Sequence, residues 1–553
     1  MGKQKKSNSS FLIQGMILAA AGMITRIIGI AYRIPVNNIL GDVGQGFYGY
    51  AFQIYSIALI LTSYSLPLAV SKLVSARVAK GEYKNARRIL NGAIFFAVIV
   101  GVVVGVLIFF GGDFMATHLL RSPLSVYALK VLAPCLFIVA LLGVLRGYFQ
   151  GLGTMLPTAA SQILEQIINA VFSIVGASYL LQAGKKVAET KGNKLIGPAY
   201  GAAGGTFGTL MGAVFALLFL VFVFYAYQRV MKRQMARDRT RYNESYSDIF
   251  RILLITIAPV ILSTAIYNVS EFFDSIMFSQ IMAAQGHTVK EYTGLWGMFN
   301  GKYNTLINIP LAMANALGAS IIPSLTAAVT EGNRKQAHAK IHMAIRFAMI
   351  IAIPSCVGFL VLAKPILSML YSGNIEIPAM MLRIGAVTVV FYCLSTVTNA
   401  VLQGVNKMTV PVKNAAISLV IHLLSLFLML VVFKWGIYAV VVSNIVFSLS
   451  MCILNARALK NAEAYIQETV KTFAIPIIAA AIMGITAAAV QLLLDLFVGG
   501  IFATLVTILV AVSVYGISLL KLGGLSEKEI LAFPKGTVFL LLFQKLHLLK
   551  QED

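Results

Sequence analysis

The chain has 553 residues, of which 59% are hydrophobic and only 12% charged, and its formal net charge at pH 7 is +24. A soluble domain with this balance would aggregate, so the composition excludes an ordinary globular protein and indicates an integral membrane protein. The positive charge does not indicate nucleic-acid binding, because the basic residues lie in short segments between apolar stretches and no basic domain of any size lies outside them.

About fourteen apolar stretches of roughly twenty residues follow one another, each long enough to cross about 30 Å of hydrocarbon. In lipid the backbone must satisfy its own hydrogen bonds, and the alternating pattern of a membrane barrel is absent. We therefore predict an all-α integral membrane fold with about fourteen transmembrane helices. The predicted spans cover residues 11–34, 47–69, 89–111, 124–146, 157–181, 197–226, 249–273, 293–317, 341–363, 379–402, 411–433, 436–456, 473–494 and 499–520.

The second half of the chain repeats features of the first. Residues 80–86 (KGEYKNA) align with 331–337 (EGNRKQA), and 150–155 (QGLGTM) align with 403–408 (QGVNKM) at nearly the same offset. Two pseudo-symmetric six-helix lobes plus two extra C-terminal helices are therefore predicted, as in transporters whose halves rock against each other. The predicted parts are an N-terminal lobe over 1–226, a basic cytoplasmic linker over 227–248, a C-terminal lobe over 249–460, the extra spans over 461–520 and a cytoplasmic tail over 521–553.

Lysine and arginine gather at alternate ends of the predicted spans. They are dense at the amino terminus, in 70–88 and in 227–248, whereas the opposite ends are poorer except between spans five and six, in 185–194. The positive-inside rule then places both termini in the cytoplasm and makes the number of spans even. We predict a multi-pass protein of the plasma membrane, whose basic belt attracts anionic membrane lipids.

The four cysteines fall inside or beside predicted spans and form no Cys-x-x-Cys pair. Neither a metal site nor a disulfide framework is indicated, and we expect no cofactor. An integral-membrane glycosyltransferase or phosphotransferase acting on polyprenyl phosphates is a remote alternative. It would need a carboxylate cluster in an interfacial loop, but the loops are short and lack an aspartate-rich motif. We therefore expect a protein that is not an enzyme.

Basic residues inside the spans mark a candidate site, because a charge in hydrocarbon is costly and normally faces a cavity or a partner. Arg26 lies in the middle of span one, and Arg33, seven residues further on, shares its face. The two either line an interior cavity or divide their roles, with Arg33 at the outer interface and Arg26 paired with a carboxylate. Lys302 opens span eight and would reach the cavity or the outer interface. Arg146 ends span four, where solvation by the following loop is the alternative to cavity lining.

Two further spans carry polar faces. On span seven, Glu271 and Asp274 could bind a cation, take up a proton or neutralise Arg26, and Asn268 extends their face. On span five, a carboxylate among amides indicates function, although such faces also hold membrane helices together. The polar residues of span five recur at intervals of three and four: Gln162, Glu165, Gln166 and Asn169.

The basic residues favour an anionic substrate. A cavity lined by Arg26, Arg33 and Lys302 would suit a diphosphate, because guanidinium groups grip phosphate oxygens in pairs. The same cavity would suit a small organic cation poorly.

Residues 146–151 (RGYFQG), 157–166 (PTAASQILEQ) and 66–74 (LPLAVSKLV) resemble the signature of the MurJ and SpoVB group of bacterial exporters. This group belongs to the multidrug/oligosaccharidyl-lipid/polysaccharide exporter superfamily. The resemblance covers nearly the whole chain, including the two extra spans. It implies two six-helix lobes, a cationic central cavity and a groove in spans thirteen and fourteen for a polyprenyl tail. It also implies that a lipid-linked peptidoglycan precursor, lipid II, is turned from the inner to the outer leaflet.

The family's charged residues carry over in part. Arg26, within 25–29 (TRIIG), matches the first-span arginine of the family, and Arg33 lies one residue out of register with a second family charge. Lys302 is near the family arginine of span eight. The proteobacterial branch has an acidic residue early in span two, where this chain has Phe47 and Tyr48, so coupling through that acid is not expected here.

Two alternatives of the same superfamily remain: an exporter of another polyprenyl-linked polysaccharide, and a multidrug or cation antiporter. A cation exporter should depend on Glu165, Glu271 and Asp274 and tolerate loss of Arg26. A coupling cation or proton is expected to bind the same carboxylates.

Overall fold

The computed structural model describes residues 2–525 except 241, 243 and 464, together with residues 527, 537 and 544. Within this part of the chain all regular structure is helical, so the predicted all-α fold is confirmed. Almost all of the predicted cytoplasmic tail, including its capping-box sequence 526–529, lies outside the described residues. The chain forms two compact units that divide after Gly301.

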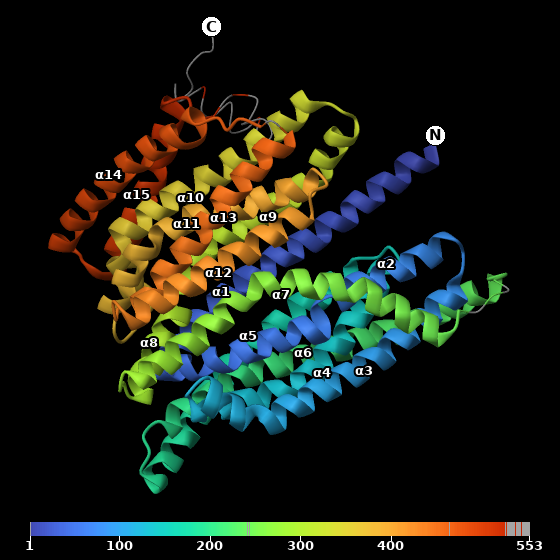
Figure 1. Cartoon of the computed structure of the whole chain (residues 1–553), viewed down its shortest axis with the longest axis horizontal. Helices are drawn as coiled ribbons and strands as arrows, with labels where there is room; N and C mark the ends of the chain where they lie inside the picture. The colour runs from blue at the N-terminus through green and yellow to red at the C-terminus, as the bar shows by residue number, and fades with distance from the viewer. Residues whose placement is uncertain are drawn as a thin grey trace. The chain divides into compact units, whose positions relative to one another are not determined.

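The first unit contains eight α-helices in its described part (Figure 1). They are α1 (Gly2–Leu59), α2 (Leu66–Ala79), α3 (Tyr83–Phe114), α4 (Val126–Gly151), α5 (Leu156–Lys191), α6 (Ile196–Arg237), α7 (Tyr246–Ala284) and α8 (Val289–Met298). Short π-helical turns at Ile60–Tyr64 and Met115–Leu119 and a 3-10 turn at Pro123–Ser125 join some of them. A buried core of aliphatic and aromatic side chains lies between α2, α3, α4, α6 and α7.

Helix α1 contains the first predicted span and the first part of the second, which continues through the π-helical turn Ile60–Tyr64 into α2. Its backbone is helical on both sides of Gly41, whose φ of +66° interrupts the helix. Glycine adopts this left-handed conformation without the steric cost that a side chain would bring. The sequence predicted a longer loop between the spans, whereas the structure changes direction at one glycine.

Small residues allow a close contact between α5 and α6. A methyl group on Gly204 would overlap the carbonyl group of Gly176 and lie 2.8 Å from the backbone nitrogen of Ala177. Between membrane helices the solvent contributes little to association, so close backbone packing of this kind supplies much of the attraction.

The second unit begins at Lys302 and contains seven α-helices in its described part. They are α9 (Asn304–Thr330), α10 (Arg334–Leu370), α11 (Glu376–Gly404), α12 (Thr409–Val431), α13 (Ile437–Glu463), α14 (Ile475–Phe497) and α15 (Gly500–Lys521). A π-helical turn at Val470–Ala474 precedes α14. The two helices without a counterpart in the sequence repeat, α14 and α15, pack on each other and on α10 (Figure 1).

Twelve helical segments among the described residues are long and apolar enough to cross a membrane. One of them, Ala20–Ala79, covers most of the first predicted span and all of the second, and the predicted seventh span lies within α7. The segments therefore agree with the predicted multi-pass architecture.

The division between the compact units differs from the lobe boundary drawn from the repeat. The repeat places that boundary in 227–248, whereas α7 and α8 belong to the first unit, which ends at Gly301. The cause is packing, because α8 lies along α1 and α7 contacts α1 and α3. The lobe boundaries inferred from the repeat remain a prediction.

The predicted linker is attached to the start of α3. Asp238 accepts a hydrogen bond from the backbone N–H of Lys84, at 2.7 Å, in the first turn of α3. Asn85 donates to the Tyr242 carbonyl at 3.1 Å and accepts from the backbone N–H of Glu244 at 3.1 Å. A carboxylate at a helix N-terminus satisfies a backbone donor and interacts well with the helix dipole. Asp238 is thus a helix cap supplied from a distant part of the chain.

Replacing Asp238 by alanine is expected to lower the free energy of unfolding by about 1 kcal/mol, because α3 loses its capping acceptor. Partial desolvation alone would raise the pKa of Asp238, but hydrogen bonds from Lys84 and Thr240 outweigh it and lower the pKa. The stabilisation is therefore complete above the unfolded-state pKa of about 3.9 and is lost as the pH falls through the lower folded-state value. Thermal unfolding in detergent from about pH 3 to pH 6 measures this. If the difference in thermal transition between the wild type and Asp238→Ala stays constant across that range, the predicted pH dependence is wrong.

Candidate functional site

Helix α1 carries the basic stripe predicted from the sequence. Arg26 and Arg33 are both exposed in the described structure. Between them lies Gly29, where an added methyl group would lie 3.8 Å from the Gln166 amide oxygen of α5. The surface of α1 between the two arginines thus lies near α5, and both arginine residues remain exposed.

An amide on α5 fixes the position of α1 beside this stripe. The Asn169 amide nitrogen donates to the Tyr32 hydroxyl at 3.1 Å, and Ser173 donates to the Asn169 amide oxygen at 2.9 Å. Asn169 is 6% exposed. Asn169, one residue of the polar face predicted on α5, thus links α5 to α1, and it orients Tyr32, which precedes Arg33.

Arg146 and Glu165 form an ion pair between α4 and α5. The Arg146 Nη2 lies 2.7 Å from Glu165 Oε2, and Arg146 Nε donates to the Ser161 hydroxyl at 3.0 Å. The side chains are only 13% and 21% exposed. The structure therefore favours pairing over solvation of Arg146 by the loop. Gln162 lies half-buried one turn before Glu165 on the same helix.

Helices α1 and α7 bring a third group of polar side chains together. The Gln53 amide nitrogen donates to Glu271 Oε2 at 3.1 Å, and Glu271 interacts electrostatically with Arg33. Glu271 and Asn268 are exposed, whereas Asp274 is buried. In an α-helix, residues three apart differ in direction by about 60° around the helix axis. Asn268 and Asp274, six residues apart, therefore point in directions about 120° apart, which explains why one is exposed and the other buried.

Lys302 has a different role from the one expected. It lies in the π-helical turn Phe299–Tyr303, in the middle of a membrane-spanning segment, and is 1% exposed. Its ammonium group donates to the carbonyl oxygens of Ser372 at 3.0 Å and Asn374 at 2.9 Å. The sequence expectation that it lines an open cavity is therefore corrected. A buried ammonium group needs acceptors, and the backbone of the turn between α10 and α11 supplies them.

Helices α1 and α8 make a close contact that was not predicted from the sequence. A methyl group on Gly297 would overlap the Asp42 carbonyl oxygen and lie 2.7 Å from the backbone nitrogen of Gly46. Beside this contact the rings of Tyr50 and Trp296 stack, with centroids 5.5 Å apart and an interplanar angle of 3°. The GxxxG spacing in 297–301 was the available signal, because this pattern allows membrane helices to approach closely.

A helical fold whose described part holds twelve segments long and apolar enough to cross a membrane, with charged side chains within them, is typical of a multi-pass membrane transporter. The chain belongs to the polysaccharide biosynthesis protein family, whose profile matches residues 12–329. The MatE profile matches residues 259–428. Both matches agree with the superfamily indicated by the sequence motifs, and the resemblance to the MurJ and SpoVB group is confirmed by the relatives below.

Two relatives come from Bacillus subtilis (strain 168). The chain is 27% identical to the lipid II flippase MurJ over 432 residues, 75% of this chain and 76% of the relative. It is 26% identical to stage V sporulation protein B over 413 residues, 74% of this chain and 76% of the relative. The chain is thus a MurJ/SpoVB-like transporter of the multidrug/oligosaccharidyl-lipid/polysaccharide exporter superfamily.

Solved structures show the same fold at lower identity. Lipid II flippase MurJ in an inward closed conformation superposes with a TM-score of 0.64 at 14% identity, covering 91% of this chain and 98% of that one. A multidrug resistance MATE family transporter in an inward-facing conformation gives a TM-score of 0.62 at 17% identity, covering 82% and 99%. At identities this low, the structural likeness shows the fold and does not identify the substrate.

Proposed function

We propose that this protein is a flippase for a polyprenyl-diphosphate-linked glycolipid, lipid II or a close relative. It would move the head group from the cytoplasmic to the outer leaflet by alternating access, without making or breaking a bond. The observation that carries the proposal is the exposed pair Arg26 and Arg33 on α1. Two guanidinium groups on one helix face suit the oxygens of a diphosphate.

The other two basic residues predicted to line the cavity, Arg146 and Lys302, already have partners in the structure. Arg146 is paired with Glu165, and Lys302 donates to two backbone carbonyls. An incoming diphosphate would have to displace these partners to engage either residue. Arg26 and Arg33 are exposed on one face of α1, so we assign the phosphate contacts to them and a positioning role to Arg146.

The carboxylates of α7 are the proposed coupling groups. Glu271 is exposed and interacts electrostatically with Arg33. A phosphate arriving at Arg33 would be repelled by the Glu271 carboxylate unless that charge were neutralised by a proton or a cation. Asn268, exposed on the same helix, would extend such a site, whereas Asp274 is buried.

A cation exporter of the same superfamily is the second candidate, because the MatE profile matches residues 259–428. Such a protein should depend on Glu165, Glu271 and Asp274. The charge of Glu165 is already offset by Arg146 at 2.7 Å, which leaves fewer carboxylates to hold a cation. Loss of Arg26 separates the candidates, since a cation exporter should tolerate it.

Expression of the protein in a bacterial strain depleted of its lipid II flippase is expected to restore growth and the appearance of lipid II on the outer face. Arg26→Ala should abolish rescue at an unchanged protein level, because the diphosphate loses a guanidinium partner. Arg229→Ala, an exposed arginine near the end of α6, is the matched control and should rescue fully. Full rescue by Arg26→Ala would remove Arg26 from the site. Failure of the wild-type protein to bring lipid II to the outer face would contradict lipid II as the substrate.

A further inference from the structure

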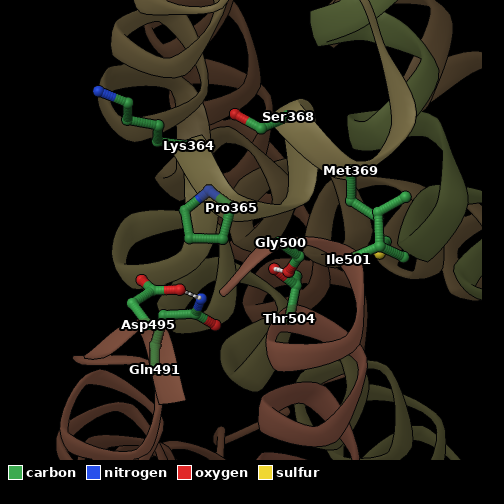
Figure 2. Close-up of a pocket in the computed structure, with 9 residues that line it drawn as sticks. All are labelled: Lys364, Pro365, Ser368, Met369, Gln491, Asp495, Gly500, Ile501 and Thr504. Carbon is green, nitrogen blue, oxygen red and sulfur yellow. Dashed lines mark hydrogen bonds between the residues drawn. The ribbon is translucent and has the colours of Figure 1, made fainter. Parts of the chain in front are cut away.

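A pocket of about 290 Å³ lies where α14 ends and α15 begins, against the last turns of α10 (Figure 2). It lies at the end of these helices remote from Lys471 and Lys521, which mark the other ends of α14 and α15. The pocket is therefore at the level where helices leave the hydrocarbon. Its polar lining consists of Lys364, Ser368, Gln491, Asp495 and Thr504.

Gln491 is the residue that points to a ligand. It is 7% exposed, and its amide nitrogen donates to the Asp495 carboxylate at 2.9 Å. Its amide oxygen is buried and accepts no hydrogen bond. A buried acceptor without a donor is costly, so an acceptor that lines a cavity is expected to receive a donor from whatever occupies the cavity.

The neighbours of Gln491 are also acceptors. Thr504 gives its hydroxyl proton to the Gly500 carbonyl at 3.2 Å, which leaves its oxygen to accept. Asp495 adds a negative charge on the same side of the pocket, where Figure 2 shows it joined to Gln491. An amide oxygen, a hydroxyl oxygen and a carboxylate together favour a cation with several N–H donors, and a primary ammonium group provides three.

The rim of the pocket carries the opposite charge. Lys364 is half-exposed on α10, and its ammonium group lies 2.5 Å from the exposed carboxylate of Glu376. An ion pair this exposed contributes little stability, so Lys364 could exchange its partner for a phosphate at small cost. The lining therefore holds one positive and one negative side chain, Lys364 and Asp495, as a zwitterion would require.

Exposed apolar side chains adjoin the lining residues in the sequence of α14 and α15. Leu496 is 80% exposed and Phe497 78% exposed at the end of α14, and Phe502 is 62% exposed at the start of α15. Large apolar side chains with this exposure on membrane helices contact lipid. A ligand with a polar head and acyl chains could place its chains on this surface and its head in the pocket.

We propose that this pocket binds the head group of a phospholipid that carries a primary ammonium, with the ammonium on Gln491 and Asp495 and the phosphate near Lys364. The bound lipid would bridge α14 and α15 to α10, which ties the two extra helices to the second unit. The site is separate from the basic stripe of α1, and the proposal does not depend on the transported substrate.

Native mass spectrometry of the detergent-purified protein tests the proposal with added phosphatidylethanolamine, phosphatidylcholine or phosphatidylglycerol of identical acyl chains. Phosphatidylethanolamine should be retained most strongly, because choline has no N–H donor and glycerol no positive charge. Gln491→Leu and Asp495→Asn should each weaken its retention about tenfold, as expected for the loss of a hydrogen bond to a charged group. Thr486→Val, at a half-buried residue on α14 whose hydroxyl group donates to the Ile482 carbonyl of the same helix, should leave retention unchanged.

Thermal unfolding in lipid-free detergent provides the second measurement. Gln491→Leu removes a buried acceptor without a donor, so its transition should not fall below that of the wild type, whereas added phosphatidylethanolamine should stabilise the wild type more than the variant. Asp495→Asn keeps the size of the side chain and carries the test if Gln491→Leu does not fold. Equal retention of phosphatidylcholine, a preference for phosphatidylglycerol, or unchanged retention in both variants would each overturn the proposal.

Discussion

An alanine at Gly297 is expected to abolish transport and to lower the thermal transition of the protein markedly. The added methyl group would overlap the Asp42 carbonyl oxygen and lie 2.7 Å from the backbone nitrogen of Gly46. The clashing atoms belong to the backbone, so no side-chain rotation relieves the overlap and α1 must move away from α8. Overpacking of this kind costs about 1–3 kcal/mol even in adaptable cores. The stacked pair Tyr50 and Trp296 would separate as well.

Gly294→Ala is the matched control, because it is the same substitution one turn earlier on α8. There the nearest atom to an added methyl group is a side-chain carbon of Val43 at 3.6 Å, an ordinary van der Waals contact. This variant should rescue a flippase-depleted strain, and its thermal transition should stay near that of the wild type. If the two variants behave alike, the close approach of α1 and α8 has no functional importance.

The glycine contact also shows what hydropathy patterns do not predict. The apolar stretches predicted the helices, since hydrocarbon leaves the backbone few other ways to satisfy its hydrogen bonds. They did not predict which helices touch, because in lipid every apolar face can be exposed equally well. Gly297 could be recognised as a close-packing position from its spacing to Gly301, but its partner on α1 could not.

Lys302 illustrates a second limit of the sequence. From sequence alone, a lysine near the start of an apolar stretch is equally compatible with a position in a cavity and with one at the membrane interface. Its actual acceptors, the carbonyls of Ser372 and Asn374, lie 70 and 72 residues further along the chain. Backbone carbonyls carry no sequence signal, so only the fold reveals that this charge is satisfied inside the second unit.

The sequence singles out polar residues within the spans but does not predict which of them contact one another. The exposed arginines of α1 and the polar residues of α5 and α7 were recognised individually, because polar residues are rare in membrane spans. Their contacts join different helices, as Gln53 and Glu271 do across α1 and α7. Gln53 had no signal of its own, since a single amide in a span is usually helix packing.

Removing the charge of Arg146 is expected to have the other large effect. Arg146→Ala would leave the Glu165 carboxylate without its cation at a site where it is only 21% exposed. Breaking a buried ion pair from one side typically costs 3–5 kcal/mol, and the partial exposure here reduces the expected loss to about 2 kcal/mol. The thermal transition in detergent should fall, and rescue of the flippase-depleted strain should be lost.

A double-mutant cycle decides whether Glu165 is a structural partner or a coupling group. If the pair positions α4 against α5, then Arg146→Ala combined with Glu165→Gln should regain most of the lost stability and part of the rescue, because no unpaired charge remains. If Glu165 takes up the coupling cation, Glu165→Gln alone should abolish transport while the thermal transition stays high, and the double variant should remain inactive. We expect the first outcome, because Arg146 contacts both Glu165 and the buried hydroxyl group of Ser161. If the double variant is inactive but fully stable, Glu165 is a coupling group, like Glu271, and not only the structural partner of Arg146.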